Sequence, residues 1–141
     1  MKVVLIACCK TKASGRMAAK YLYQGALFKK ALSYAQSINP DRIYILSAEY
    51  HLLPLDKEIG YYQNSLNDKN TQEKKAWAEV VLKQMKKEGL DFQKDEFIVL
   101  AGDNYCKYLK DSLSNFSRPF EGLRQGKQMQ RLNQLLGICK K

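Results

Sequence analysis

Three short runs of the chain are continuously apolar and rich in β-branched residues. They are Lys2–Cys8 (KVVLIAC), Arg42–Ala48 (RIYILSA) and Asp95–Ala101 (DEFIVLA). An apolar run without polar alternation is typical of a strand that is buried on both faces of a parallel sheet. We therefore predict three core strands in a mostly parallel sheet.

Helical periodicity appears between these runs. Gly25–Ile38 carries apolar residues at the spacing of one helix face and ends at an Asn-Pro-Asp turn. Thr71–Gly89 is predicted to be an amphipathic helix with Thr71 as its N-cap and Gly89 at its end. Its apolar stripe is expected at Ala76, Trp77, Val80, Val81 and Met85.

The remaining elements are shorter. We expect a loop or helix start over Ala13–Lys20, helices over Tyr105–Leu113 and Gly126–Leu136, and an extended piece at Pro119-Phe120. This order of elements predicts one α/β domain over residues 1–141, with three layers and helices on both faces of the sheet.

One long segment shows no regular period. Residues 49–68 read EYHLLPLDKEIGYYQNSLND. Loops of this length inside a domain are usually functional or disordered. Because the segment holds three tyrosines, a histidine and several leucines, we interpret it as an ordered functional loop.

Composition narrows the class of protein. The 141 residues are 45% hydrophobic and 27% charged, as in a soluble globular protein. No apolar run approaches the roughly 18–20 residues of a membrane span, and we see no signal peptide, so we expect a cytoplasmic protein without membrane contact. Four cysteines without CxxC spacing and a single histidine favour free thiols over a zinc site. We expect no metal and no cofactor.

Charge is unevenly distributed along the chain. The net charge is +10, and residues 1–40 hold seven Lys or Arg and no acid. Residues 41–104 have a net charge of −3, and residues 105–141 a net charge of +6. If the fold brings the two ends together, they form a positive face suited to a polyanion such as a nucleic acid or a nucleotide. The alternative is a merely solvated surface.

Polar residues follow each predicted strand. The three strands end in CCKTK, SAEYH and AGDNY. Ligand sites of parallel sheets lie off the carboxyl ends of the strands, so these stretches predict one composite site. Lys10 and Lys12 are the candidates to hold a phosphate there, although a desolvated lysine is also a candidate Schiff-base nucleophile. A nucleophilic role for Cys9 stays open.

Two carboxylates are candidates for catalysis at these strand ends. Glu49 and Asp103 form the pair to consider for hydrolysis of a glycosidic bond, which needs an activated water and a stabilised oxocarbenium-like state. Asp103 is equally a candidate helix N-cap. His51 is a candidate proton carrier or a packed side chain. Further expected binding residues are Ser47, Tyr62, Asn104, Tyr105, Arg118, Arg124, Lys127 and Arg131.

An ordered set of motifs runs along nearly the whole chain. It comprises Cys8-x-Lys10-x-Lys12, LY-x-G-x-LF (22–28), ILSA-x-x-x-LL (45–53), YY-x-x-SL (61–66), AG-x-x-Y (101–105) and P-x-x-GL-x-x-G-x-x-M (119–129). The set resembles a family of small, largely uncharacterised bacterial and phage domains. That family is distantly similar to the uracil-DNA glycosylase-like superfamily, to YaaA-like peroxide-stress proteins and to a domain of archaeosine-forming enzymes. The resemblance implies a three-layer α/β fold and work on nucleobases or nucleic acids.

Three hypotheses of function follow. The first is a nucleic-acid-acting enzyme that hydrolyses or exchanges the N-glycosidic bond of a modified base, with the base flipped into a pocket lined by Tyr62 and Tyr105. The cationic residues would then hold phosphates. The second is a non-catalytic nucleic-acid-binding module, with salt-dependent affinity. The third is an enzyme that acts on free nucleosides or nucleotides.

Overall fold

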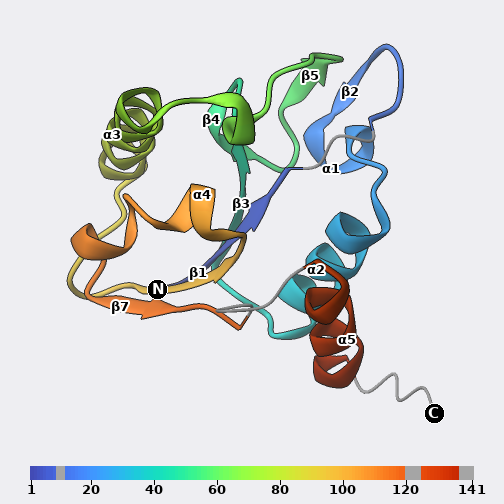
Figure 1. Cartoon of the computed structure of the whole chain (residues 1–141). Helices are drawn as coiled ribbons and strands as arrows, with labels where there is room; N and C mark the ends of the chain where they lie inside the picture. Colours follow the sequence, from blue (N-terminus) through green and yellow to red (C-terminus); the bar gives the residue numbers. More distant parts are fainter. Residues whose placement is uncertain (9–11, 120–124, 137–141) are drawn as a thin grey trace.

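A five-stranded mixed sheet forms the centre of the protein (Figure 1). The computed structural model describes residues 1–8, 12–119 and 125–136. The strands lie in the order β4-β3-β1-β6-β7, and all neighbours are parallel except the antiparallel pair of β3 and β4. Their bounds are β1 (Lys2–Ala7), β3 (Arg42–Ser47), β4 (His51–Pro54), β6 (Glu96–Leu100) and β7 (Asn115–Ser117). The predicted mostly parallel sheet is confirmed, with three core strands at its centre.

Residues of the central strand alternate between two separate apolar clusters. Val3 and Leu5 of β1 pack into one cluster, and Val4 and Ile6 into the other. All four side chains are at most 1% exposed. This burial on both faces explains why the strand is continuously apolar.

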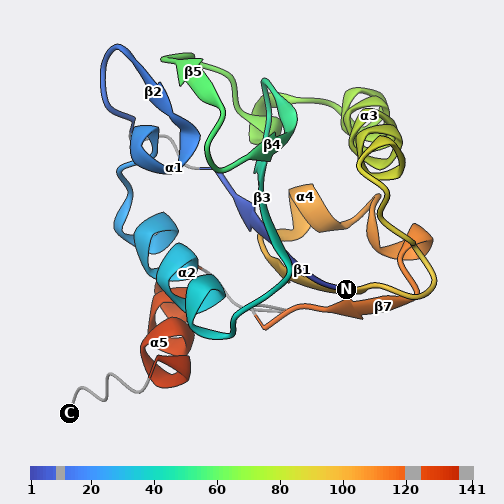
Figure 2. The same cartoon turned by 180° about the vertical axis from the view of Figure 1, so that it is seen from behind.

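Helices cover both faces of the sheet, and the two opposite views agree on their placement (Figures 1 and 2). The helices α3 (Thr71–Lys87) and α4 (Asp103–Cys106) pack on the cluster of Val3, while α2 (Ala26–Ser37) and α5 (Gln125–Leu135) pack on the cluster of Val4. The 3-10 turn η2 (Lys110–Ser112) follows α4. The arrangement is compatible with the three-layer α/β domain that the sequence predicts.

Two segments expected to be irregular contain short strands. β5 (Glu58–Gly60) pairs antiparallel with β2 (Arg16–Ala18), which precedes α1 (Ala19–Leu22). The long segment also holds β4 and the 3-10 turn η1 (Leu66–Asp68). The sequence did not predict these short strands, because strands of three or four residues are too short to show a period.

The expected N-cap and stripe of α3 need correction. Asn70, not Thr71, caps the helix, because its side chain accepts from the Glu73 N–H while Glu73 bonds back to the Asn70 N–H. Ala76 and Val80 are exposed. The buried stripe consists of Trp77, Ala78, Val81 and Met85.

The C-terminal elements also differ in detail from the prediction. Helical structure begins at Asp103, two residues before the expected Tyr105, and breaks into α4 and η2. The extended piece lies at β7, before Pro119, and pairs with β6. Phe120 falls outside the described residues.

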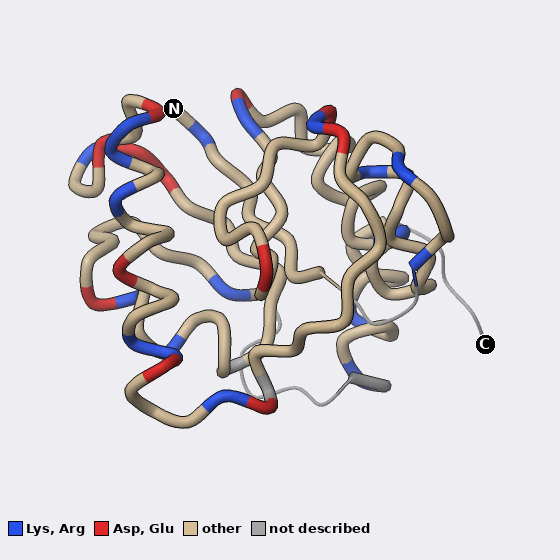
Figure 3. The backbone as a smooth tube through the Cα atoms, turned by 90° about the horizontal axis from the view of Figure 1, so that it is seen from above, with Lys and Arg blue, Asp and Glu red and all other residues tan. Residues whose placement is uncertain are grey.

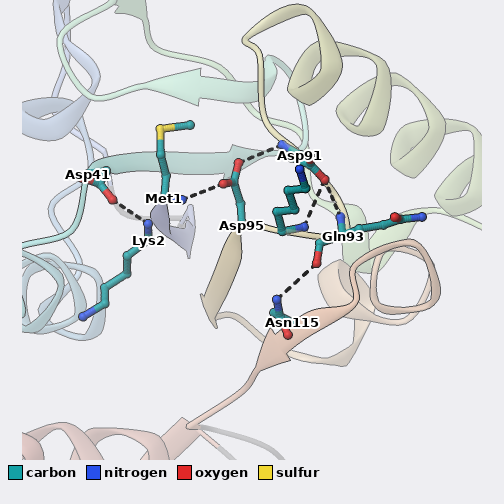
Figure 4. Close-up of polar contacts among 8 residues, drawn as sticks. Met1, Lys2, Asp41, Asp91, Gln93, Asp95 and Asn115 are labelled. Carbon is teal, nitrogen blue, oxygen red and sulfur yellow. Dashed lines mark hydrogen bonds and ion pairs between the residues drawn. The ribbon is translucent and has the colours of Figure 1, made fainter.

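A polar network ties the amino ends of the strands together (Figure 4). The Met1 ammonium lies 2.6 Å from Asp95 Oδ1, and the Lys2 N–H donates to Asp41 Oδ2. Asp95 also accepts from the Asp91 N–H and is only 6% exposed. These bonds hold β1 and β6 at the edge of the sheet opposite to their carboxyl ends.

Helices from the two cationic ends of the chain lie side by side. α2, from the N-terminal part, packs beside α5, from the C-terminal part, and neither helix carries an acidic residue. Seen from above, Lys and Arg positions are mixed with Asp and Glu on the side of the N-terminus, whereas few acidic positions lie among them on the side towards the C-terminus (Figure 3). The two chain ends therefore meet, as the predicted positive face requires.

Among the described residues, no helix is both long and apolar enough to cross a bilayer.

Candidate functional site

The carboxyl ends of the parallel strands meet as the sequence predicts. After β1, the Cys8 N–H donates to the Leu46 carbonyl of β3 at 3.0 Å. The Cys8 Sγ lies 3.3 Å from the Tyr105 hydroxyl, which follows β6. Arg118, after β7, donates from Nη2 to the Ala101 carbonyl at 3.2 Å. Side chains that follow β1, β6 and β7 therefore lie along one edge of the sheet, next to the backbone at the end of β3.

A buried chain of hydroxyl groups begins at the end of β3. Ser47 is fully buried, and its Oγ lies 2.8 Å from the Tyr62 hydroxyl, which lies 2.6 Å from the Tyr23 hydroxyl. Ser47 Oγ already accepts from the N–H groups of Glu49 and Tyr50. Because a hydroxyl oxygen has two lone pairs, Ser47 donates its own hydrogen to Tyr62.

Burial keeps the Tyr62 hydroxyl protonated. It raises the pKa of Tyr62 far above its ordinary value, and the nearby Cys8 and Tyr23 act in the same direction. Tyr62 is 9% exposed and also stacks edge-on against Tyr50. Tyr62 therefore acts as a fixed neutral ring and hydrogen-bonding group.

Three tyrosine rings surround the Lys12 ammonium. Its Nζ lies 4.5 Å from the centroid of the Tyr62 ring and 5.9 Å from those of Tyr23 and Tyr61. Backbone pairing sets this position. Lys12 forms an isolated antiparallel β-bridge with Tyr23, and the N–H of Ala13 donates to the Leu22 carbonyl. Ring faces attract a cation, so the cage holds the Lys12 charge at a defined place.

A pocket of about 410 Å³ opens beside Lys12. This volume lies within the range of roughly 300–1,000 Å³ that is usual for small-molecule sites. The described residues that line this pocket, which we call the Lys12 pocket, are Lys12, Tyr61, Gln63, Asn64, Ser65 and Asp68. The Tyr61 side chain is 51% exposed and receives a hydrogen bond from Gln63.

Glu49 reaches the Lys12 pocket through one hydrogen bond. The carboxylate is exposed on the turn between β3 and β4, and its Oε1 accepts from Asn64 Nδ2 at 3.0 Å. Since Asn64 lines the pocket, Glu49 orients an amide of the pocket wall and lies at its border.

His51 is part of an aromatic stack next to this edge. It has a left-handed backbone with φ of 65°, and its ring stacks on that of Trp77 with 6.4 Å between the centroids and 25° between the planes. Burial lowers the pKa of His51, and Glu49 only partly opposes this shift. Trp77 donates to the Ser47 carbonyl and meets the Tyr105 ring edge-on. Packing thus accounts for His51, and His51 does not line the Lys12 pocket.

The predicted site residues fall into separate groups. Lys12 lines the pocket and Glu49 borders it, while Ser47 and Tyr62 lie buried beneath Lys12 and do not line the pocket. Tyr105 contacts Cys8 and Trp77 instead.

Predicted residues from the C-terminal part lie elsewhere. Asn104 accepts a hydrogen bond from Lys74 of α3. Lys127 and Arg131 are exposed on α5, which packs beside α2 at the end of the molecule away from β2 and β5 (Figure 1). They are not brought to the Lys12 pocket. Lys10, Arg124, Cys9 and the side chain of Asp103 lie outside the described part of the structure.

Sequence reasoning missed several contributors to this site. Gln63, Ser65 and Asp68 line the pocket, and Tyr23 completes the cage. The available signal was the polar run QNSLND directly after two tyrosines. Tyr23 belongs to the LY-x-G-x-LF motif, but its place in the cage could not be predicted, because only the tertiary pairing with Lys12 brings it there. Within the described residues, no group of three His, Cys, Asp or Glu side chains is placed to hold a metal ion.

Comparison with known proteins identifies one family. A profile described as "Family of unknown function (DUF6884)" matches residues 3–134. No curated protein and no solved structure matches the chain significantly. The matched range includes every residue of the Lys12 pocket and of the hydroxyl chain beneath it.

Proposed function

Since the chain belongs to the family DUF6884, whose function is unknown, we propose a function from its pocket: it binds one nucleotide unit of a nucleic acid in the Lys12 pocket and acts on that unit. The observation that carries this proposal is the combination of a caged ammonium and an exposed tyrosine ring in one pocket of nucleotide-compatible size.

Each wall of the pocket suits a part of a nucleotide. A lysine charge held between rings attracts a phosphate without further reorganisation of the side chain. The exposed ring of Tyr61 offers a stacking face for a base, which is worth about 1–3 kcal/mol in single-strand binders. The amides of Gln63 and Asn64 provide donors and acceptors of the kind that read base edges.

We propose hydrolysis or exchange of an N-glycosidic bond as the reaction. Glu49 uses one carboxylate oxygen to orient Asn64, and its other oxygen remains for a water or for the positive charge that develops on the sugar. A base in a duplex has to be flipped out to enter such a pocket. The position of the site at the carboxyl edge of a layered α/β structure supports the proposed similarity to the uracil-DNA glycosylase-like superfamily.

Binding is tested with a fluorescein-labelled single-stranded oligonucleotide titrated at several salt concentrations. Lys12→Gln is expected to weaken binding and to reduce the slope of log affinity against log salt by about 0.7, the value for one lost phosphate contact on a single strand. The matched control is Lys20→Gln, because Lys20 pairs with Asp56 and does not line the pocket. Equal affinities and slopes for the two variants would refute the proposed phosphate contact.

The reaction is tested by chromatography of bases released from DNA and RNA oligonucleotides that carry modified bases. Glu49→Gln is expected to reduce release by about 10²-fold or more, as for loss of a general acid or base. Glu58→Gln is the control, because Glu58 is exposed and pairs with Arg16 outside the pocket. Binding without any released base would favour a non-catalytic nucleic-acid-binding module.

A further inference from the structure

Asp68 is the one acidic residue among the described residues that line the Lys12 pocket. It is exposed at the end of η1, and its backbone N–H donates to the carbonyl of Ser65, the residue before η1. Its carboxylate takes part in none of the ion pairs that join described residues. By contrast, the carboxylate of Glu49 is engaged by Asn64. Both oxygens of the Asp68 carboxylate are therefore available to a ligand in the pocket.

The pocket thus carries an ammonium and a carboxylate on different residues of its wall. An ionised carboxylate only accepts hydrogen bonds, and it repels a phosphate. A nucleotide in this pocket therefore keeps its phosphate near Lys12 and turns a donor-rich part toward Asp68.

We infer that Asp68 selects ligands that present two adjacent hydrogen-bond donors to its two carboxylate oxygens. This inference rests on the proposed function, because it names which nucleotides the Lys12 pocket prefers. Two parts of a nucleotide have the required chemistry: the N1–H and N2–H group of guanine, and the 2′,3′-diol of ribose, which in an RNA chain only the 3′-terminal nucleotide keeps.

The other bases lack this paired arrangement. Adenine and cytosine place a single amino group beside a ring nitrogen that accepts, and that lone pair repels the second carboxylate oxygen. Uracil and thymine present one N–H between two carbonyl oxygens. Since a polar group left without its partner in a binding site is costly, a carboxylate discriminates strongly against these edges.

Calorimetric titration with GMP, dGMP, AMP and dAMP tests the inference. If Asp68 reads guanine, GMP and dGMP bind with similar affinity and both bind more tightly than the adenine nucleotides. If Asp68 reads the diol, GMP and AMP bind more tightly than their deoxy forms. In either case we expect a preference of about tenfold or more, in line with hydrogen bonds to a charged group.

Three variants assign the preference to the carboxylate. Asp68→Asn keeps the shape of the side chain, removes its charge and is expected to abolish the preference. Asp68→Glu keeps the charge and is expected to retain part of it. Asp56→Asn is the control, because Asp56 pairs with Lys20 and does not line the pocket. Thermal unfolding of each variant checks that it is folded.

The outcomes separate this inference from the proposed function. If all four nucleotides bind equally, and Asp68→Asn changes no affinity, the inference is overturned while the proposed nucleotide site stands. If neither the nucleotides nor the oligonucleotide binds, the proposed function fails and the inference fails with it.

Discussion

Removing the hydroxyl of Tyr62 tests the buried chain that supports Lys12. Tyr62→Phe deletes one oxygen and keeps the ring on which the Lys12 ammonium lies. In the wild-type protein that oxygen accepts from Ser47 and bonds to Tyr23. The substitution therefore perturbs the hydrogen bonds with little change in packing.

The expected loss of stability follows from the hydrogen bonds that Ser47 and Tyr23 lose in Tyr62→Phe. Ser47 is fully buried and its two lone pairs are occupied, so its hydrogen is left without an acceptor. An unsatisfied buried donor costs about 1–3 kcal/mol, and loss of the bond to Tyr23 removes about 1 kcal/mol more. We expect Tyr62→Phe to lower the free energy of unfolding by about 2–4 kcal/mol. In a chain of 141 residues this corresponds to a fall in Tm of about 7–14 °C.

Urea denaturation followed by circular dichroism measures this difference. The control is Tyr21→Phe, because the Tyr21 side chain is 61% exposed and should change stability by less than about 0.5 kcal/mol. If Tyr62→Phe is as mild as Tyr21→Phe, Ser47 does not depend on Tyr62 as its acceptor, and the direction of the hydrogen-bond chain is wrong.

Three further predictions concern the stability of elements outside the Lys12 pocket. Asn70→Ala removes the cap of α3 and should cost about 1 kcal/mol in urea denaturation, whereas Asn70→Asp should cost little. Asn39 has a φ of 52°, so Asn39→Ala should lower stability by about 1 kcal/mol and Asn39→Gly should not. The hydrogen bond from the Asp91 N–H, and next to it that from the Met1 ammonium, lower the pKa of Asp95. The ionised Asp95 carboxylate therefore stabilises the folded protein above the unfolded-state pKa, and this contribution is lost as the pH falls through the folded-state pKa. Asp95→Asn should therefore be less stable than wild type in thermal unfolding at pH 7, and the difference should shrink towards pH 3.

The sheet could be predicted because its central strands are buried on both faces. Continuous apolar runs such as that of β1 admit few other structures, and the order of elements then sets the mostly parallel topology. The same reasoning located the edge where the strand ends meet. It failed for β2 and β5, since strands of three residues carry no periodic signal.

The site was harder to predict than the fold because residues distant in sequence assemble it. Lys12 was recognisable as a cation after a strand, but its cage depends on a tertiary pairing with Tyr23 and on the anchoring of Tyr62 to Ser47. Tyr62 and Ser47 were interpreted as substrate-binding residues from their position alone. Both residues are buried and support the wall of the Lys12 pocket from beneath. The neighbouring Tyr61 is exposed and offers its ring face to a ligand.

The location of α5 bears on which basic residues could contact a nucleic acid bound at the Lys12 pocket. The basic C-terminal part of the chain predicts phosphate contacts for Lys127 and Arg131, yet α5 packs beside α2, away from β2 and β5. Neither of these two residues lines the Lys12 pocket. Lys12 is the one cation among the described residues that line the pocket, so the proposed phosphate contact rests on Lys12 rather than on the net charge of +10. A local contact of this kind, in a pocket of one-nucleotide size, supports the proposal that the protein binds a single unit rather than an extended polymer.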